Sequence, residues 1–120
     1  MKKIDDFTKG YIEAALWSSI DENEEPLDKN YVVEDLSSEA LSEIISDCEA
    51  FQSEMAEYLE KAGTPEYNGH DFWLTRNGHG AGFWDRGYEK EVSAVLTGAS
   101  KFMGECYLYV GANGKIYLDY

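Results

Sequence analysis

The chain has 120 residues, of which 43% are hydrophobic, and it carries a formal net charge of −14 at pH 7. This length and composition are typical of one domain with its own core, and we expect a single domain over residues 1–120. The negative charge disfavours direct nucleic-acid binding and favours a partner with a basic surface.

The sequence shows no sign of export or of membrane insertion. No apolar run resembles a signal peptide or a membrane span. Cys48 and Cys106 lie far apart, each at an apolar position of a periodic segment, which is typical of reduced thiols in a core. We therefore expect a cytoplasmic protein that makes no membrane contact.

The charge is concentrated in the first half of the chain. Residues 1–60 hold 17 acidic and 4 basic side chains, a net charge of −13, whereas residues 61–120 hold 7 and 6, a net charge of −1. We expect an acidic helical half over residues 1–63. We expect residues 66–120 to form a second half that contains a hairpin, a helix and another hairpin. Many proteins have acidic surfaces only because charge keeps them soluble, and this remains an alternative to a role in partner binding.

The first predicted helix runs from about Asp5 to Ser19, since apolar residues recur near helical spacing and Asp5 or Asp6 can cap it. An acidic loop follows over residues 21–26. Residues 27–36 are ambiguous, and Tyr31-Val32-Val33 within them is expected to form either a short strand or an extended connection.

The second predicted helix has the clearest pattern. Ser37 or Ser38 caps it, and Gly63 followed by Pro65 marks its end. One apolar stripe contains Leu41, Ile44, Ile45, Cys48, Phe51, Met55, Tyr58 and Leu59. The opposite side contains Glu39, Glu43, Asp47, Glu49, Glu54, Glu57 and Glu60. A solvated helix usually mixes both signs of charge to gain i,i+4 pairs, and this side does not.

The second half of the chain is expected to contain two hairpins. Residues 70–76 and 83–86 are rich in strand-favouring types around a glycine-rich turn. A third helix follows, with Val92 and Leu96 on its apolar face. Residues 105–110 and 116–120 form the final hairpin across Asn113-Gly114, with Tyr107, Tyr109 and Tyr117 on one face. The predicted fold is α+β, a four-stranded antiparallel sheet with about three helices packed on one side, in the order α-α-β-β-α-β-β.

The segment from Gly69 to Gly87 contains both histidines and both arginines of the chain. Three interpretations compete. His70, Asp71, His79 and Asp85 could be metal ligands. A histidine paired with an aspartate beside Arg76 could act as a general base. Alternatively, the glycines serve a tight bend, the tryptophans fill the core, and Asp71–Arg86 or Arg76–Asp85 pairs bridge the two strands. The spacing matches no strong motif, so we expect no bound metal and no cofactor, and we assign no catalytic residue.

The same segment, GHDFWLTRNGHGAGFWDRG over residues 69–87, resembles a signature of small acidic proteins encoded by bacteriophages and prophages. The agreement extends to residues 11–19, to residues 47–51 and to the hairpin over residues 109–117. The resemblance implies a viral accessory protein in a bacterial host cytoplasm. It implies no activity and no site residue.

Charge and context together favour a protein that acts by binding a host protein. An acidic helical face can imitate the phosphates of DNA, so a DNA-mimic inhibitor of a restriction, CRISPR or similar defence enzyme is expected. The contacts are expected from Glu39, Glu43, Asp47, Glu54 and Glu57. One alternative is a small enzyme or ligand binder centred on His70, Asp71, Arg76, His79 and Asp85. Another is a virion or assembly component that pairs through the tyrosine face; the protein is expected to be a monomer or a small homo-oligomer.

Overall fold

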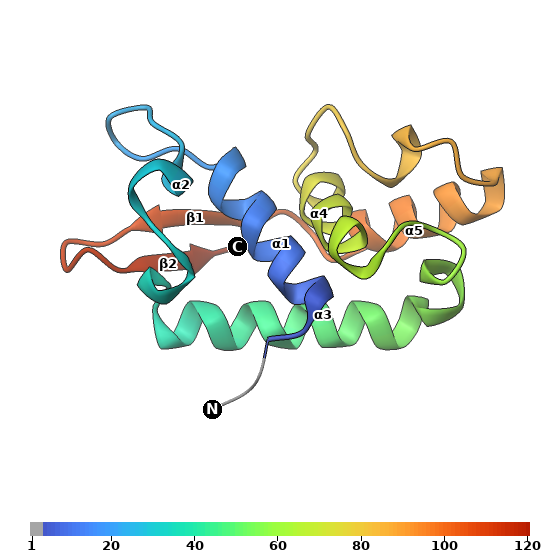
Figure 1. The fold of residues 1–120 in the computed structure, drawn as a ribbon, viewed down its shortest axis with the longest axis horizontal. Coiled ribbons are helices and arrows are strands. Elements are labelled where there is room, and N and C mark those ends of the chain that lie inside the picture. The colour runs from blue at the N-terminus through green and yellow to red at the C-terminus, as the bar shows by residue number, and fades with distance from the viewer. Residues whose placement is uncertain (1–3) are drawn as a thin grey trace.

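The computed structural model describes residues 4–120 and is built mainly of helices (Figure 1). The elements in chain order are α1 (Asp6–Ser18), α2 (Leu27–Asn30), the 3₁₀ helix η1 (Val33–Asp35), α3 (Ser38–Leu59), α4 (Pro65–Arg76), the 3₁₀ helix η2 (Phe83–Asp85), α5 (Lys90–Phe102), β1 (Tyr107–Val110) and β2 (Ile116–Asp119). α3 runs along one long side of the molecule, and the other elements lie to one side of it (Figure 1).

The two predicted helices of the first half are confirmed, and local capping explains where they begin. The Asp5 carboxylate accepts a hydrogen bond from the Thr8 N–H at 2.8 Å at the start of α1. The Ser37 hydroxyl accepts one from the Ala40 N–H at 3.1 Å at the start of α3. Each bond satisfies a donor that has no partner within its helix. The apolar stripe of α3 is buried at Ile44, Cys48 and Phe51.

The predicted four-stranded sheet is wrong, because residues 65–76 form a helix and not a strand. Thr64 caps α4 by accepting a hydrogen bond from the Tyr67 N–H at 3.3 Å, and Pro65 occupies the first turn. Proline suits that turn because its fixed φ is already helical and its missing N–H would have had no partner there. Gly63 and Pro65 thus mark the end of α3 and the start of the next helix together.

The composition of α4 explains why it resembles a strand in the sequence. Its second half is buried on every side, from Phe72 and Trp73 to Thr75 and Arg76. A helix that is buried all round has no polar face and therefore shows no 3.6-residue period. The aromatic and β-branched residues that fill this central position are also those that strands favour.

Residues 83–86 do not form the second strand of that hairpin either. Phe83 to Asp85 make the single turn η2, whose Phe83 side chain is fully buried. The Phe83 N–H donates to the Thr75 hydroxyl at 3.1 Å, which ties the glycine-rich loop to α4. Gly82 allows this approach, since a Cβ there would lie 2.2 Å from the same hydroxyl oxygen.

The final hairpin and the third predicted helix, which is α5, are confirmed. β1 and β2 pair antiparallel with Leu108 opposite Leu118 and Tyr109 opposite Tyr117. The Tyr109 and Tyr117 rings stack at 5.7 Å between centroids on the predicted tyrosine face. Residues 27–36 contain α2 and η1. Between them, Tyr31 and Val32 form an extended connection, with φ of −131° and −129°, and Val33 begins η1. The Ser37 N–H donates to the Ile116 carbonyl at 2.8 Å and joins the hairpin to the start of α3.

α1 and α4 cross in direct backbone contact at two glycines. A Cβ on Gly10 would lie 2.1 Å from the Glu66 carbonyl oxygen, and a Cβ on Gly69 would lie 1.9 Å from the Phe7 carbonyl oxygen. Real side chains do not approach that closely, so any larger residue forces the two helices apart. The Phe7, Tyr11 and Phe72 rings pack beside the crossing.

We predict that Gly10→Ala and Gly69→Ala each lower the free energy of unfolding by about 1–3 kcal/mol, the usual cost of overpacking. Gly98→Ala is the matched control, because a Cβ at this position in α5 meets nothing within 4 Å. Gly98→Ala should raise the free energy of unfolding by about 0.5–1 kcal/mol, since alanine is a better helix former than glycine. Urea unfolding followed by circular dichroism measures all three, and equal effects at the three positions would contradict the close crossing.

Candidate functional site

The five residues of the predicted chemical centre do not converge on one site. His70 lies near Glu13 of α1, with its Nε2 atom 3.9 Å from the Glu13 carboxylate. Asp71 and Arg76 each have a different ion-pair partner. His79 and Asp85 are exposed. Successive side chains of a helix point about 100° apart. Because residues 65–76 form a helix, His70, Asp71 and Arg76 point in different directions and do not share one face.

Asp71 and Arg86 form a pair that holds the glycine-rich loop. The Asp71 side chain is fully buried, and the Arg86 guanidinium donates to it through Nε at 3.1 Å and Nη2 at 2.8 Å. The bond to Asp71 raises the pKa of Arg86. This confirms the expected Asp71–Arg86 pair, although it joins a helix to a loop and not two strands. Asp71 is therefore occupied as a structural group.

Arg76 is the most connected buried side chain described here. Its Nη1 donates to the Asp47 carboxylate at 2.9 Å and to the Tyr11 hydroxyl at 3.1 Å. Its Nε and Nη2 donate to the carbonyls of Gly104 and Met103 at 2.8 Å and 3.0 Å. The expected Arg76–Asp85 pair does not form. Arg76 instead connects α1, α3, α4 and the residues that follow α5.

Asp47 differs from the other acids predicted for partner binding. Its side chain is only 15% exposed, and besides Arg76 it accepts a hydrogen bond from the Tyr120 hydroxyl at 2.7 Å. The structure thus places it in an internal network. Burial, followed by the hydrogen bonds to Asp47 and Glu43, keeps the pKa of Tyr120 well above its ordinary value, so this hydroxyl remains a donor at neutral pH.

Neither thiol is arranged for nucleophilic chemistry. Cys48 and Cys106 are buried and free, as expected of core thiols. Burial is the largest of the causes that raise the pKa of each thiol above its ordinary value. Reactivity requires the thiolate, which such surroundings disfavour.

The other four predicted acids form one exposed face of α3, which we call the acidic face. Glu39, Glu43, Glu54 and Glu57 are all exposed, and at 100° per residue they fall within about 60° of one another around the helix. Among residues 4–120, no lysine or arginine forms an ion pair with any of the four. The face is therefore available to a partner.

A cluster that the sequence analysis missed lies where α1 crosses α4. Glu13, Glu66 and His70 bring one ligand atom each to within 4.8 Å of one another. The signal was present in the sequence, because Glu66 and His70 are four residues apart and share one side of a helix. The sequence analysis does not bring the three residues together, because it predicts a strand over residues 70–76.

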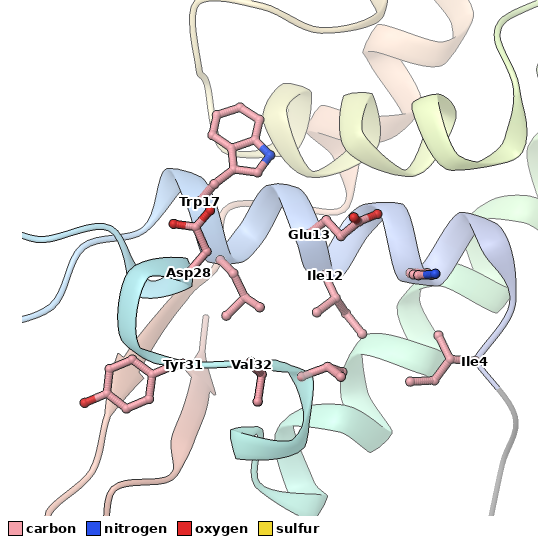
Figure 2. Close-up of a pocket in the computed structure, with 10 residues that line it drawn as sticks. Ile4, Ile12, Glu13, Trp17, Asp28, Tyr31 and Val32 are labelled. Carbon is pink, nitrogen blue, oxygen red and sulfur yellow. The ribbon is translucent and has the colours of Figure 1, made fainter.

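An apolar groove of about 540 Å³ lies beside α1 (Figure 2). Ile12 lines it from α1, and Val32 lines it from the connection between α2 and η1. Lys9, Glu13 and Asp28 are its charged members. Ligand pockets usually combine an apolar lining with a few converging polar groups. The groove and the Glu13–Glu66–His70 cluster thus share Glu13 but differ in their chemistry.

Comparisons with known protein families, with curated proteins and with solved structures give no significant match. None of the helices described is both long and apolar enough to cross a membrane.

We predict that Arg76→Met lowers the free energy of unfolding by about 3 kcal/mol or more, because it leaves the Asp47 charge buried without its partner. Asp47→Asn should cost less, since the amide oxygen still accepts from Arg76. Urea unfolding of both variants measures the difference. A loss below about 1 kcal/mol for Arg76→Met would contradict the central role of this guanidinium.

We predict opposite effects for two glutamates of the acidic face. Glu57 lies in the last turn of α3, where the helix dipole disfavours a negative charge, so Glu57→Gln should raise stability by about 0.3–1 kcal/mol. Glu39 lies in the first turn, where a negative charge is favourable, so Glu39→Gln should lower it by about the same amount. Thermal unfolding at low salt measures both, and the differences should shrink in 1 M salt.

Proposed function

We propose that this protein is a phage accessory protein that acts by binding a basic surface of a host protein through the acidic face of α3. The observation that carries the proposal is the set of exposed glutamates that lack a basic partner among the described residues. The resemblance of residues 69–87 to phage-encoded proteins supplies the biological context.

The arrangement of these glutamates works against the stability of the free protein. Glu39 and Glu43 are four residues apart, and Glu54 and Glu57 are three apart, so each pair places like charges side by side on the helix. Each such pair costs about 0.2–0.5 kcal/mol. A partner that brings lysines or arginines to this face removes the repulsion, and the cost is then recovered as binding free energy.

The length of the acidic face suits a partner that binds nucleic acid. Glu39 and Glu57 are 18 residues apart, which corresponds to about 27 Å along the helix axis. A duplex of that length contains about eight base pairs at 3.4 Å per step. We therefore propose that the basic surface is the nucleic-acid-binding groove of a host defence or processing enzyme. Asp47 takes no part, because Arg76 and Tyr120 already occupy its carboxylate.

The test is a capture experiment with three baits. One is the wild type, and the second carries glutamine at Glu39, Glu43, Glu54 and Glu57. The third is a matched control with glutamine at four other exposed glutamates, Glu22, Glu24, Glu34 and Glu91. Both variants lose four negative charges, so they differ only in where those charges lie. Each bait is exposed to bacterial cytoplasmic protein, and duplex DNA is added as a competitor.

We predict that wild type and control retain the same nucleic-acid-binding enzyme and that the face variant loses it. The duplex should displace the captured enzyme, and binding should weaken steeply with salt because the contact is electrostatic. Equal capture by all three baits would mean that the acidic face only confers solubility. Capture that DNA does not affect would retain the partner interaction and eliminate mimicry.

A further inference from the structure

We propose that Glu13, Glu66 and His70 form a binding site for a divalent transition-metal ion of the Zn²⁺ class. The site lies on α1 and α4, whereas the acidic face lies on α3, and the proposal does not depend on the proposed function. Each of the three residues contributes one ligand atom, two carboxylate oxygens and one imidazole nitrogen.

The geometry already approaches that of a coordination shell. All three ligand atoms lie within 4.8 Å of one another, and His70 Nε2 lies 3.9 Å from Glu13 Oε1. Zinc binds nitrogen and oxygen at about 2.0–2.2 Å, so two ligand atoms around one tetrahedral ion are about 3.4 Å apart. Small movements of flexible glutamate side chains close the difference. The backbone does not have to move.

Two helices hold the three ligands in fixed relation. Glu66 and His70 are one turn apart on α4, and Glu13 is about one turn beyond Gly10 on α1. The backbone contacts of Gly10 with Glu66 and of Gly69 with Phe7 determine how these turns meet. Sites built on rigid helices are more precise than sites built on loops.

His70 supplies an observation that is independent of the two acids. Its Nε2 atom is buried and has no hydrogen-bond partner, although the side chain as a whole is 23% exposed. A buried polar atom usually has a partner, because leaving it without one costs free energy. The edge of the ring packs against Tyr67 at 5.7 Å between centroids, which restricts its orientation. A bound ion would supply the missing partner.

The two carboxylates are crowded when no ion is bound. One carboxylate oxygen of Glu13 and one of Glu66 lie within 4.8 Å of each other. Two negative charges at this separation repel each other. A divalent cation between them reverses the sign of the local field and removes that repulsion.

The donor set favours a transition metal over Ca²⁺ or Mg²⁺. Calcium requires six to eight oxygen ligands, and magnesium keeps most of its water, whereas imidazole suits zinc, iron, nickel and copper. Three protein ligands leave at least one coordination position for water, and the 47% exposure of the Glu13 side chain keeps the site open to solvent.

The test is calorimetric titration of the folded 120-residue chain with Zn²⁺ alone. We compare the wild type with Glu13→Gln, Glu66→Gln and His70→Gln. His79→Gln is the matched control, because His79 is the other histidine of the chain and lies exposed, away from the cluster. Glu22→Gln controls for the loss of one surface carboxylate. Circular dichroism checks that each variant is folded.

We expect one strong site in the wild type, weakened at least tenfold by each ligand variant and changed less than twofold by either control. Glu13→Gln should also raise the melting temperature of the metal-free protein, since a neutral amide relieves the crowding, while it removes most of the stabilisation by Zn²⁺. Absence of a strong site in the wild type would overturn the proposal. So would a site that His70→Gln leaves intact.

Discussion

Two backbone contacts between α1 and α4 determine how the two central helices of this molecule meet. Because Gly10 and Gly69 have no side chains, the helices approach until each glycine touches the other backbone. That approach brings Tyr11 into contact with Phe72 and Trp73 in the core. It also brings Glu13 beside Glu66 and His70 at the surface. The packing of the core and the geometry of the candidate metal site thus have one common cause.

Arg76 connects this pair of helices to the remaining structure. A guanidinium has five donors in a fixed planar group, and here four partners accept from it. Its pairing with Asp47 fixes α3 against α4, and the Tyr120 hydroxyl brings the C-terminal residue to the same carboxylate. A charge at this depth is tolerated because it is paired and hydrogen-bonded. The network therefore gives Asp47 a structural role, whereas the neighbouring glutamates of α3 remain exposed.

The molecule contains two groups of carboxylates whose like charges lie close together, and the two groups differ in kind. The acidic face is long, exposed and without basic partners among residues 4–120, which suits a protein surface of opposite charge. The cluster around His70 is small and partly enclosed, which suits a single ion. Proteins commonly accept such repulsion where function requires it. The apolar groove beside α1 lies next to the cluster around His70 and shares Glu13 with it. Its lining is mainly apolar.

The sequence alone determined the elements whose signals are local. Asp5 and Ser37 cap their helices through nearby N–H groups, the stripe of α3 has a clear helical period, and Asn113-Gly114 marks the final turn. Only the tertiary structure decided α4, because a helix buried on every side has no period and Thr64-Pro65 also reads as the end of α3. It likewise decided the pairing of Arg76 with Asp47 and of Glu13 with His70. Those contacts join residues 29 and 57 positions apart, and helix crossing, not sequence spacing, brings them together.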